Sequence, residues 1–327
     1  KADTSQQVSF KAIKLSIDSL SDKKFQKGER QLLTLNLDSP ELLWQKDSVC
    51  RQKLFVLPSV LKSFKIRKIN IRNGNFGYEA NKNLTLNISG IDFFANGLQG
   101  TVLKGPEASI HYDSLFYSSK SCWLNIANTG QWLETKELLW NNRFFRISRL
   151  RFLHSDTMKQ DTLSIHSVTF TKPKLNPLIF DRKFIAERAC LYQASFSQNY
   201  QDSVNRPDTL PVKHWNNFVK LPFKTDIAYL CILKSRFNLI SKRYGKDFSI
   251  SSRFNMKFYG FKAGYDTSHL ISQPKHWEAV LRKTKIRQNN LTIRLEKTNL
   301  NSDSGTLQMK DISLRQRHDS SLQFRIN

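Results

Sequence analysis

Apolar and polar residues alternate along most of the chain, but single steps of three break the alternation. In residues 84–93 the apolar positions fall two, two, three and two apart, and similar spacings recur at 8–15, 163–170 and 307–314. These positions point all round a helix, which argues against an amphipathic helix. In a regular strand, a step of three would place the later apolar side chains on the opposite face of the sheet. A β-bulge adds one residue and keeps the apolar side chains of both halves on the same face. The spacing therefore predicts bulged strands, with bulges near Ser89-Gly90, His166-Ser167 and Lys310-Asp311.

A second pattern places a proline within the alternation. It occurs at residues 35–42 and again at 168–175, where Pro40 and Pro173 interrupt apolar positions. Proline in a strand belongs at an edge or a bulge. An alternative interpretation makes Ser39-Pro40-Glu41 the start of a helix with Ser39 as its cap. We favour the strand because the neighbours are strand-like. Asn73-Gly74 and Asn96-Gly97 are typical of hairpin turns, and Gly74 and Gly90 lie where a bulge would favour glycine.

A longer repeat is indicated by three copies of one apolar triad. Residues 66–71, 147–152 and 227–232 share it, about 80 residues apart, so Ile69, Leu150 and Leu230 should occupy equivalent positions facing a concave surface. Such spacing is typical of stacked units that bury their apolar faces against one another. Short helices or loops are expected before the copies and near the C-terminus, at Pro58–Ser63, Trp132–Trp140, His214–Lys220 and Pro274–Lys283. Approximate units would be 1–100, 101–180 and 181–327, forming one repetitive region.

Composition and charge narrow the function classes. The 327 residues carry a net charge of +25, which favours polyanions, anionic lipid headgroups or acidic glycans, although a basic solvated surface explains it equally well. The basic residues alternate with apolar ones, so we expect them on opposite sheet faces, which argues against nucleic-acid stacking. No apolar stretch is long enough for a membrane helix. Both ends look cut, so we expect a fragment of a longer protein. The spacing of Cys50, Cys122, Cys190 and Cys231 leaves disulfides undecided.

The patterns at 65–79 (KIRKINIRNGNFGYE), 84–93 (LTLNISGIDF) and 35–44 (LNLDSPELLW) resemble the AsmA-like envelope proteins of diderm bacteria. The likeness rests on recurrence over most of the chain rather than on any single match. It implies a long curved β-sheet of repeating groove units in the periplasm, anchored in the inner membrane by a helix outside this chain. It also implies transport of lipids along an apolar groove. The family carries no catalytic motif.

Catalytic and metal-binding patterns are missing from the sequence. There is no GxSxG, HExxH, GxGxxG or P-loop, and none of the seven histidines has a ligand partner at metal-binding spacing. We therefore expect a non-enzymatic protein without a cofactor or a metal.

Together these patterns predict an all-β fold: an elongated, strongly curved, repetitive antiparallel sheet, groove-like, with bulged strands and a few short helices. Two functions remain open. The first is a lipid conduit, whose partners are phospholipid or another lipid, with an anionic membrane surface or envelope proteins as further candidates. The second is a structural or adhesive protein with a packed core, whose basic surface binds acidic glycans or anionic membrane. No specific nucleic acid is expected. The predicted lipid-binding residues are Ile69, Ile71, Phe76, Ile88, Ile91, Phe93, Leu150, Phe152, Ile165, Val168, Phe170, Leu230, Ile232, Phe237 and Met256.

Overall fold

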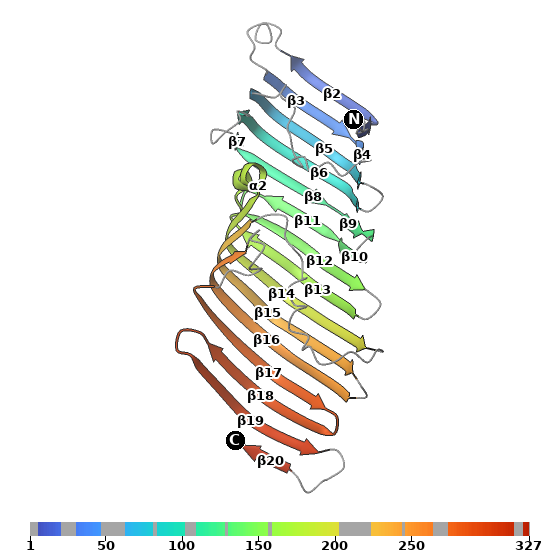
Figure 1. The fold of residues 1–327 in the computed structure, drawn as a ribbon. Helices are drawn as coiled ribbons and strands as arrows, with labels where there is room; N and C mark the ends of the chain where they lie inside the picture. Colours follow the sequence, from blue (N-terminus) through green and yellow to red (C-terminus); the bar gives the residue numbers. More distant parts are fainter. Residues whose placement is uncertain are drawn as a thin grey trace, which may run out of the picture. The chain divides into compact units, whose positions relative to one another are not determined.

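The structure is a computed structural model, and its described residues are almost entirely β-strand (Figure 1). It describes residues 6–20, 31–46, 63–80, 84–101, 109–127, 130–155, 159–202, 224–243, 246–263, 274–316 and 323–326. Within these ranges there are twenty strands and one helix, α2 (Leu175–Asp181). The predicted all-β class is confirmed.

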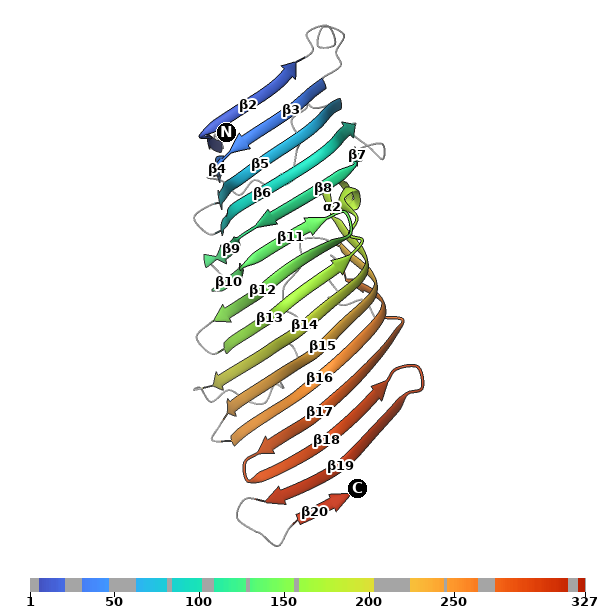
Figure 2. The same ribbon diagram turned by 180° about the vertical axis from the view of Figure 1, so that it is seen from behind.

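The chain divides into two compact units. The first comprises Lys1–Asn128, Trp132–Ser148 and Leu175–Asp181, and the second comprises Thr129–Gln131, Arg149–Lys174 and Arg182–Asn327. In each unit the strands pair into a mixed, mostly antiparallel sheet. Most strands bend along their length, as the two opposite views in Figures 1 and 2 show.

The first unit is built from long strands that are often interrupted. β1–β2 pairs antiparallel with β3–β4, which runs parallel to β5, and β5 pairs antiparallel with β6. One further interrupted strand, β7–β8–β9, pairs with β6, and β8 pairs with β11. The bounds are β1 (Gln6–Lys11), β2 (Lys14–Leu20), β3 (Gln31–Asp38), β4 (Glu41–Lys46), β5 (Ser63–Ala80), β6 (Leu84–Thr101), β7 (Ser109–His111), β8 (Ser114–Ser119), β9 (Ser121–Ile126), β10 (Gln131–Thr135) and β11 (Glu137–Asn141). β12 (Phe144–Ser155) belongs to the first unit up to Ser148 and to the second from Arg149.

The second unit repeats this plan. β13 pairs antiparallel with β14, which runs parallel to β15, and each strand from β15 to β20 pairs antiparallel with the next. The bounds are β13 (Lys159–Thr171), β14 (Lys183–Asp202), β15 (Lys224–Arg243), β16 (Lys246–Ala263), β17 (His276–Gln288), β18 (Leu291–Asn301), β19 (Thr306–Gln316) and β20 (Gln323–Ile326).

The steps of three correspond to kinks that adjacent strands usually share. At Gly90 the backbone φ is +61°, and the β5–β6 register is irregular there before it resumes, which confirms the first predicted bulge. At His166-Ser167 and Lys310-Asp311 the predicted bulge, with one extra residue on one strand only, is wrong. Ile165 pairs with Ala194 and Ser167 with Tyr192, so His166 and its neighbour Gln193 (φ 52°) are kinked together and the register is kept.

The third site behaves like the second. Lys297 pairs with Lys310 and Leu295 with Ile312, while Asp311 takes a φ of 51° opposite an equally skipped residue. One extra residue on one strand does occur in the second unit, where β15 and β17 each shift register against β16. A shared kink has the same effect on side-chain direction as a bulge, and each apolar half-strand therefore faces the same side as its neighbours.

Several local predictions need correction. Trp132–Trp140 lies in strands β10 and β11, and Pro274–Lys283 lies largely in β17, so neither is a helix. Asn73-Gly74 and Asn96-Gly97 are not hairpin turns, because both lie inside long strands, where Asn73 and Gly97 take the positive φ that Asn and Gly tolerate. The expected helices or loops at residues 58–62 and 214–220 lie outside the described residues.

The two proline patterns have different outcomes. At Ser39 the strand is interrupted by a φ of 47° and continues as β4 past the buried Pro40, so the strand interpretation is confirmed. At Pro173 the strand has already ended, and α2 begins at Leu175. The prediction that Leu175 lies in a strand is therefore wrong. Pro177 lies in the first turn of α2, where a missing N–H costs no helical hydrogen bond.

The predicted triad repeat holds for two of its three copies. β5 and β15 both follow a parallel neighbour, and Ile69 and Leu230, each 8% exposed, lie at equivalent places in them. The middle copy differs because β12 pairs antiparallel with β11, as the return strand of a hairpin. Leu150 is therefore not topologically equivalent to Ile69 and Leu230. The three approximate units stay a prediction.

Candidate functional site

The strand register of the second unit aligns apolar residues across the whole sheet. Directly opposed residues of paired strands project from the same face. One such line, the central row, crosses seven strands from β13 to β19. It consists of Val168, Leu191, Ile232, Met256, Ala279, Leu300 and Leu307.

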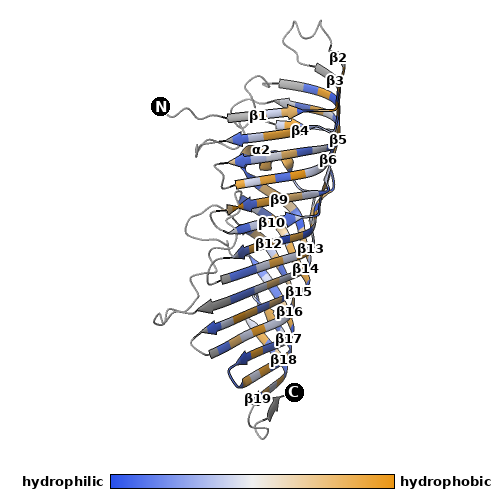
Figure 3. Cartoon of the chain, turned by 90° about the vertical axis from the view of Figure 1, so that its right-hand side faces the viewer, coloured by the Kyte–Doolittle hydropathy of each residue, from blue (hydrophilic) through white to orange (hydrophobic). Residues whose placement is uncertain are grey.

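Further apolar rows flank the central row on the same face. One contains Phe170, Ala189, Leu230, Phe258 and Trp277. Another contains Leu239, Ile250, Ile286, Ile293 and Leu314. Because the kinks restore the alternation, rows on both sides of a kink face the same way. We call this continuous surface the apolar face of the second unit. Figure 3 shows the resulting change between hydrophobic and hydrophilic residues along the strands.

The first unit has an apolar face of its own, built in the same way. Two rows are Ile17–Leu35–Ile69–Ala95–Leu115 and Phe10–Leu42–Phe76–Ile88–Cys122. Exposure falls across both rows, from 46% at Ile17 and 53% at Phe10 to 8% at Leu115 and 9% at Cys122. Ile69 on β5 is 8% exposed and Ala95 on β6 is 0% exposed, so the face is most open at β1 and β2 and covered at the later strands of the rows.

Burial on the second unit's apolar face also changes from strand to strand. Ile165 and Val168 on β13, and Ile227 on β15, are 5% exposed or less, so this end is packed. Leu191, Ile232, Met256 and Leu300 are half-buried, and Leu307 is 54% exposed. The largest fully buried side chains among the described residues are Thr135, Cys231 and Ser235, all of them small. Outside the packed end, bulky side chains such as Ile232 and Met256 keep surface that no described element covers.

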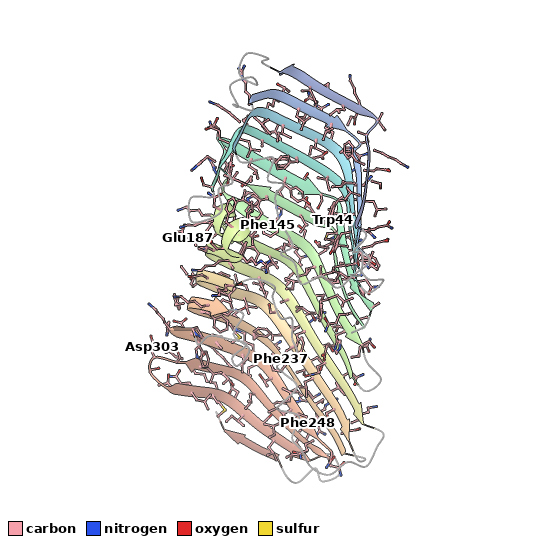
Figure 4. All side chains as sticks on the ribbon, turned by 45° about the horizontal axis from the view of Figure 1, so that its top comes forward. Trp44, Phe145, Glu187, Phe237, Phe248 and Asp303 are labelled. Atoms are coloured by element: carbon pink, nitrogen blue, oxygen red, sulfur yellow. The ribbon has the colours of Figure 1, made fainter. Side chains whose placement is uncertain are left out.

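Aromatic rings strengthen the packed end and leave the rest of the face open. Phe170 and Phe184 meet edge to face with ring centroids 4.7 Å apart, and Phe184 is 5% exposed. Phe237 and Phe254 lie 6.0 Å apart and are both half-buried. Figure 4 shows Phe237 over the sheet, whereas Glu187 and Asp303 lie at its margin.

The structure brings most of the predicted site residues onto these faces. Ile69, Ile71, Phe76, Ile88, Ile91 and Phe93 share the apolar face of the first unit. Ile165, Val168, Phe170, Leu230, Ile232, Phe237 and Met256 share that of the second. The described pairings of β12 do not extend to Leu150 and Phe152, which are both half-buried. Whether the apolar faces are concave stays a prediction.

Sequence reasoning missed several residues of the faces. Ala95 and Ala189, both 0% exposed, and Ala279, 3% exposed, lie in rows between large side chains. Alanine carries too little hydrophobicity to stand out in a pattern, and the signal lies in what it opposes: Ala189 lies between Phe170 and Leu230. Leu300 was missed because Asn299 and Asn301 flank it and Thr298 replaces the apolar residue two positions earlier.

Several buried polar groups lie on the second unit's apolar face. Asp161 is 2% exposed, and its Oδ2 lies 3.5 Å from Nδ1 of His154. Ser252 and Thr284, both nearly buried, are joined through their hydroxyl oxygens at 2.7 Å, and Ser252 also donates to backbone carbonyls. Buried polar groups need such partners. Thr298, 4% exposed, lies on the same face, and its hydroxyl has no hydrogen-bond partner among the described residues. The face therefore carries buried hydroxyl groups between its apolar rows, and not all of them are paired.

The three cysteines of the described residues, Cys122, Cys190 and Cys231, are free thiols. Burial raises the pKa of Cys122 to about 11. Burial, together with the neighbouring Cys231, raises the pKa of Cys190 to about 12. Because the thiolate is the reactive form, Cys122 and Cys190 are poor nucleophiles near neutral pH.

Within the described residues, no three His, Cys, Asp or Glu side chains are grouped to hold a metal ion. The helical part of the described structure, α2, is too short to span a bilayer. No family model matches the chain, and no curated protein matches it.

Proposed function

We propose that the chain is a non-enzymatic lipid-binding protein that holds and conducts acyl chains along the apolar faces of its sheets. The supporting observation is the central row, in which seven successive strands each place an apolar residue on one face. Large apolar surfaces that remain exposed are rare unless they bind something.

The dimensions of the central row suit an acyl chain. Strands are spaced ~4.8 Å apart, so the seven residues span roughly 29 Å. The hydrocarbon core of a bilayer is ~30 Å thick and contains two acyl layers, so one chain needs about half of that length. The row therefore has room for a lipid tail and for its movement along the face. Acyl chains need no specific polar partner, which fits the apolar side chains of the central row.

A packed structural core is the competing proposal. It requires the bulky side chains of the apolar face to be covered, as Ile165 and Val168 are. Met256 and Leu300 are only half-buried, and Leu307 is 54% exposed. This gradient of exposure favours an occupant that is not part of the described chain.

The resemblance of residues 65–79 and 84–93 to AsmA-like proteins supports a cellular location for the proposed lipid binding. In that setting the protein would act in the periplasm or cell envelope and carry phospholipid or a similar lipid between membranes.

Lipid extraction from the purified protein, followed by mass spectrometry, tests the proposal. The parent should carry phospholipid, and Met256→Asp should lose it because a carboxylate then lies mid-face. The matched control is Asn255→Asp, which places the same charge on the opposite face of the same strand. Asn255 Oδ1 accepts the backbone N–H of Lys234 at 2.6 Å, and an aspartate can keep that bond.

The stability of the two variants separates the competing proposals. On an open face the new carboxylate stays near water, so Met256→Asp should unfold close to the parent's urea midpoint. In a packed core it would be buried without a partner and cost several kcal/mol. A parent without lipid, combined with an unfolded Met256→Asp variant, would establish the packed core instead.

A further inference from the structure

The polar face of the second unit carries a line of five basic residues across five strands. Arg236 opposes Arg253, Arg253 opposes Arg282, Arg282 opposes Lys297, and Lys297 opposes Lys310. Four of the five side chains are exposed, and Lys297 is half-buried. Strand pairing places such neighbours about 5 Å apart at Cβ, so the five charges form a close-packed row.

Two adjoining rows of the same face extend this positive surface. Lys285 opposes Arg294 in one, and Arg287 and Arg315 both oppose Thr292 in the other. The three rows from β15 to β19 contain fifteen positions, of which nine are basic and none acidic. We call the nine residues the basic array: Arg236, Arg253, Arg282, Lys285, Arg287, Arg294, Lys297, Lys310 and Arg315.

Among the described residues, no ion pair neutralises a member of the basic array. Glu296 and Asp311 lie at the neighbouring kinks and are exposed, but neither forms an ion pair with the array. The nearest acidic residue along β17, Glu278, pairs with Lys257 at 3.3 Å. Within the array, Arg236 donates from Nε to the hydroxyl of Ser195 at 3.0 Å, which is a neutral partner.

Directly opposed like charges destabilise a sheet. At Lys285, desolvation and then the charges of Arg287 and Arg294 lower the pKa of the ammonium group. A face that tolerates this repulsion is electrostatically complementary to a ligand with many negative charges.

The chemistry and geometry of the basic array narrow the ligand. Its remaining six positions are Ser, Thr, Asn and one Ile, so no aromatic ring is available for base stacking, and single-stranded nucleic acid is disfavoured. The charges extend in two directions, ~4.8 Å per strand and roughly 7 Å between alternate residues along a strand. A two-dimensional array matches a surface of anionic headgroups better than it matches one linear polymer.

We propose that the basic array is a docking site for an anionic phospholipid bilayer. The second unit would then lie with its polar face on the membrane and its apolar face turned away. This proposal concerns the face opposite the lipid-binding rows and does not depend on the function proposed above.

Co-sedimentation with vesicles tests the array directly. Vesicles of equal parts phosphatidylcholine and phosphatidylglycerol should bind the parent, and binding should weaken steeply as salt increases. The triple variant Arg253→Gln, Arg282→Gln, Lys297→Gln should bind roughly 100-fold more weakly, because each basic residue contributes about fivefold near such a surface. Its folding should persist, since the substitutions relieve repulsion. Replacing both arginines with lysine should leave binding close to that of the parent.

The matched control removes three basic residues elsewhere in the second unit: Lys224→Gln, Lys262→Gln, Lys275→Gln. These side chains are exposed and lie outside the basic array. Because the net charge is the same in both triple variants, equal binding by the two would overturn the proposal. Strong binding of the parent to pure phosphatidylcholine would also overturn it, as would binding to heparin or to an oligonucleotide without binding to vesicles. Met256→Asp should bind the vesicles normally, which separates this outcome from the lipid-extraction result.

Discussion

Asn73 and Lys234 perform the same task in two different units. Each takes a φ of 50°, and each donates its backbone N–H to a side-chain oxygen on the next strand. The acceptor is Oδ1 of Asp92, 2.9 Å from Asn73, and Oδ1 of Asn255, 2.6 Å from Lys234. The kink thus has a recurring construction, in which a left-handed residue turns its N–H out of the ladder and a short polar side chain receives it.

The backbone strain of this kink predicts a residue preference. Asn73→Val should lower the free energy of unfolding by about 1–2 kcal/mol, because a β-branched residue tolerates positive φ poorly. Asn73→Gly should leave stability unchanged or raise it. Urea denaturation of the variants measures both effects. Lys65→Val, at a regular exposed position of β5, is the control and should be neutral. Equal effects at both positions would contradict the assigned role of the kink.

The acceptor side of the kink makes a separate prediction. Asp92→Ala should cost about 1 kcal/mol, since the N–H of Asn73 loses its partner. Asp92→Asn keeps an oxygen at the same place and should retain most of the stability. Hydrogen exchange at the Asn73 amide should accelerate in Asp92→Ala alone. If both variants exchange like the parent, the bond does not protect this amide.

The raised pKa of Cys122 predicts a stability loss in alkali. In the unfolded chain this thiol titrates at its ordinary pKa near 9.0, whereas in the folded protein its pKa is about 11. The contribution is therefore complete below pH 9, declines as the unfolded thiol ionises, and is lost above the folded pKa. Cys122→Ala should flatten the decline between pH 9 and 11 by on the order of 2 kcal/mol. Parallel curves for parent and variant would refute this.

Repulsion within the basic array should be measurable without any ligand. Arg282 opposes both Arg253 and Lys297, so Arg282→Gln should raise the melting temperature at low ionic strength. The gain should shrink as salt screens the charges. Lys262→Gln, outside the array, should show no such salt-dependent gain. A destabilised Arg282→Gln at low salt would show that the arginine has a favourable partner.

Much of this architecture could be predicted from the sequence, because strand periodicity is a local property. The steps of three located the kinks at Gly90, His166 and Asp311, but a single chain cannot reveal that its neighbour bends at the same point. The extra-residue interpretation failed at His166 for this reason. Asn73-Gly74 was misread because a left-handed dipeptide suits a hairpin turn and a mid-strand kink equally well.

The candidate site also contains residues that could be predicted from local alternation and residues that could not. Bulky residues such as Ile232 and Met256 stood out from their alternation, and the structure places them side by side. Ala189 and Leu300 were missed because their membership of a row depends on which residues oppose them. The basic array escaped notice for the same reason: Arg253, Arg282 and Lys297 are far apart in sequence, and only the register aligns them.

The shared kinks also constrain how such a chain can change in evolution. Asp311 and its neighbour across the β18–β19 pair are kinked together. Deleting one residue from one of these strands would reverse the direction of the side chains in half of it, so that apolar and charged residues would exchange faces. The partner strand would need a matching loss to restore the pairing. Length changes in this protein should therefore accumulate at strand ends, such as the turn at residues 302–305, and be purged from the strand interiors.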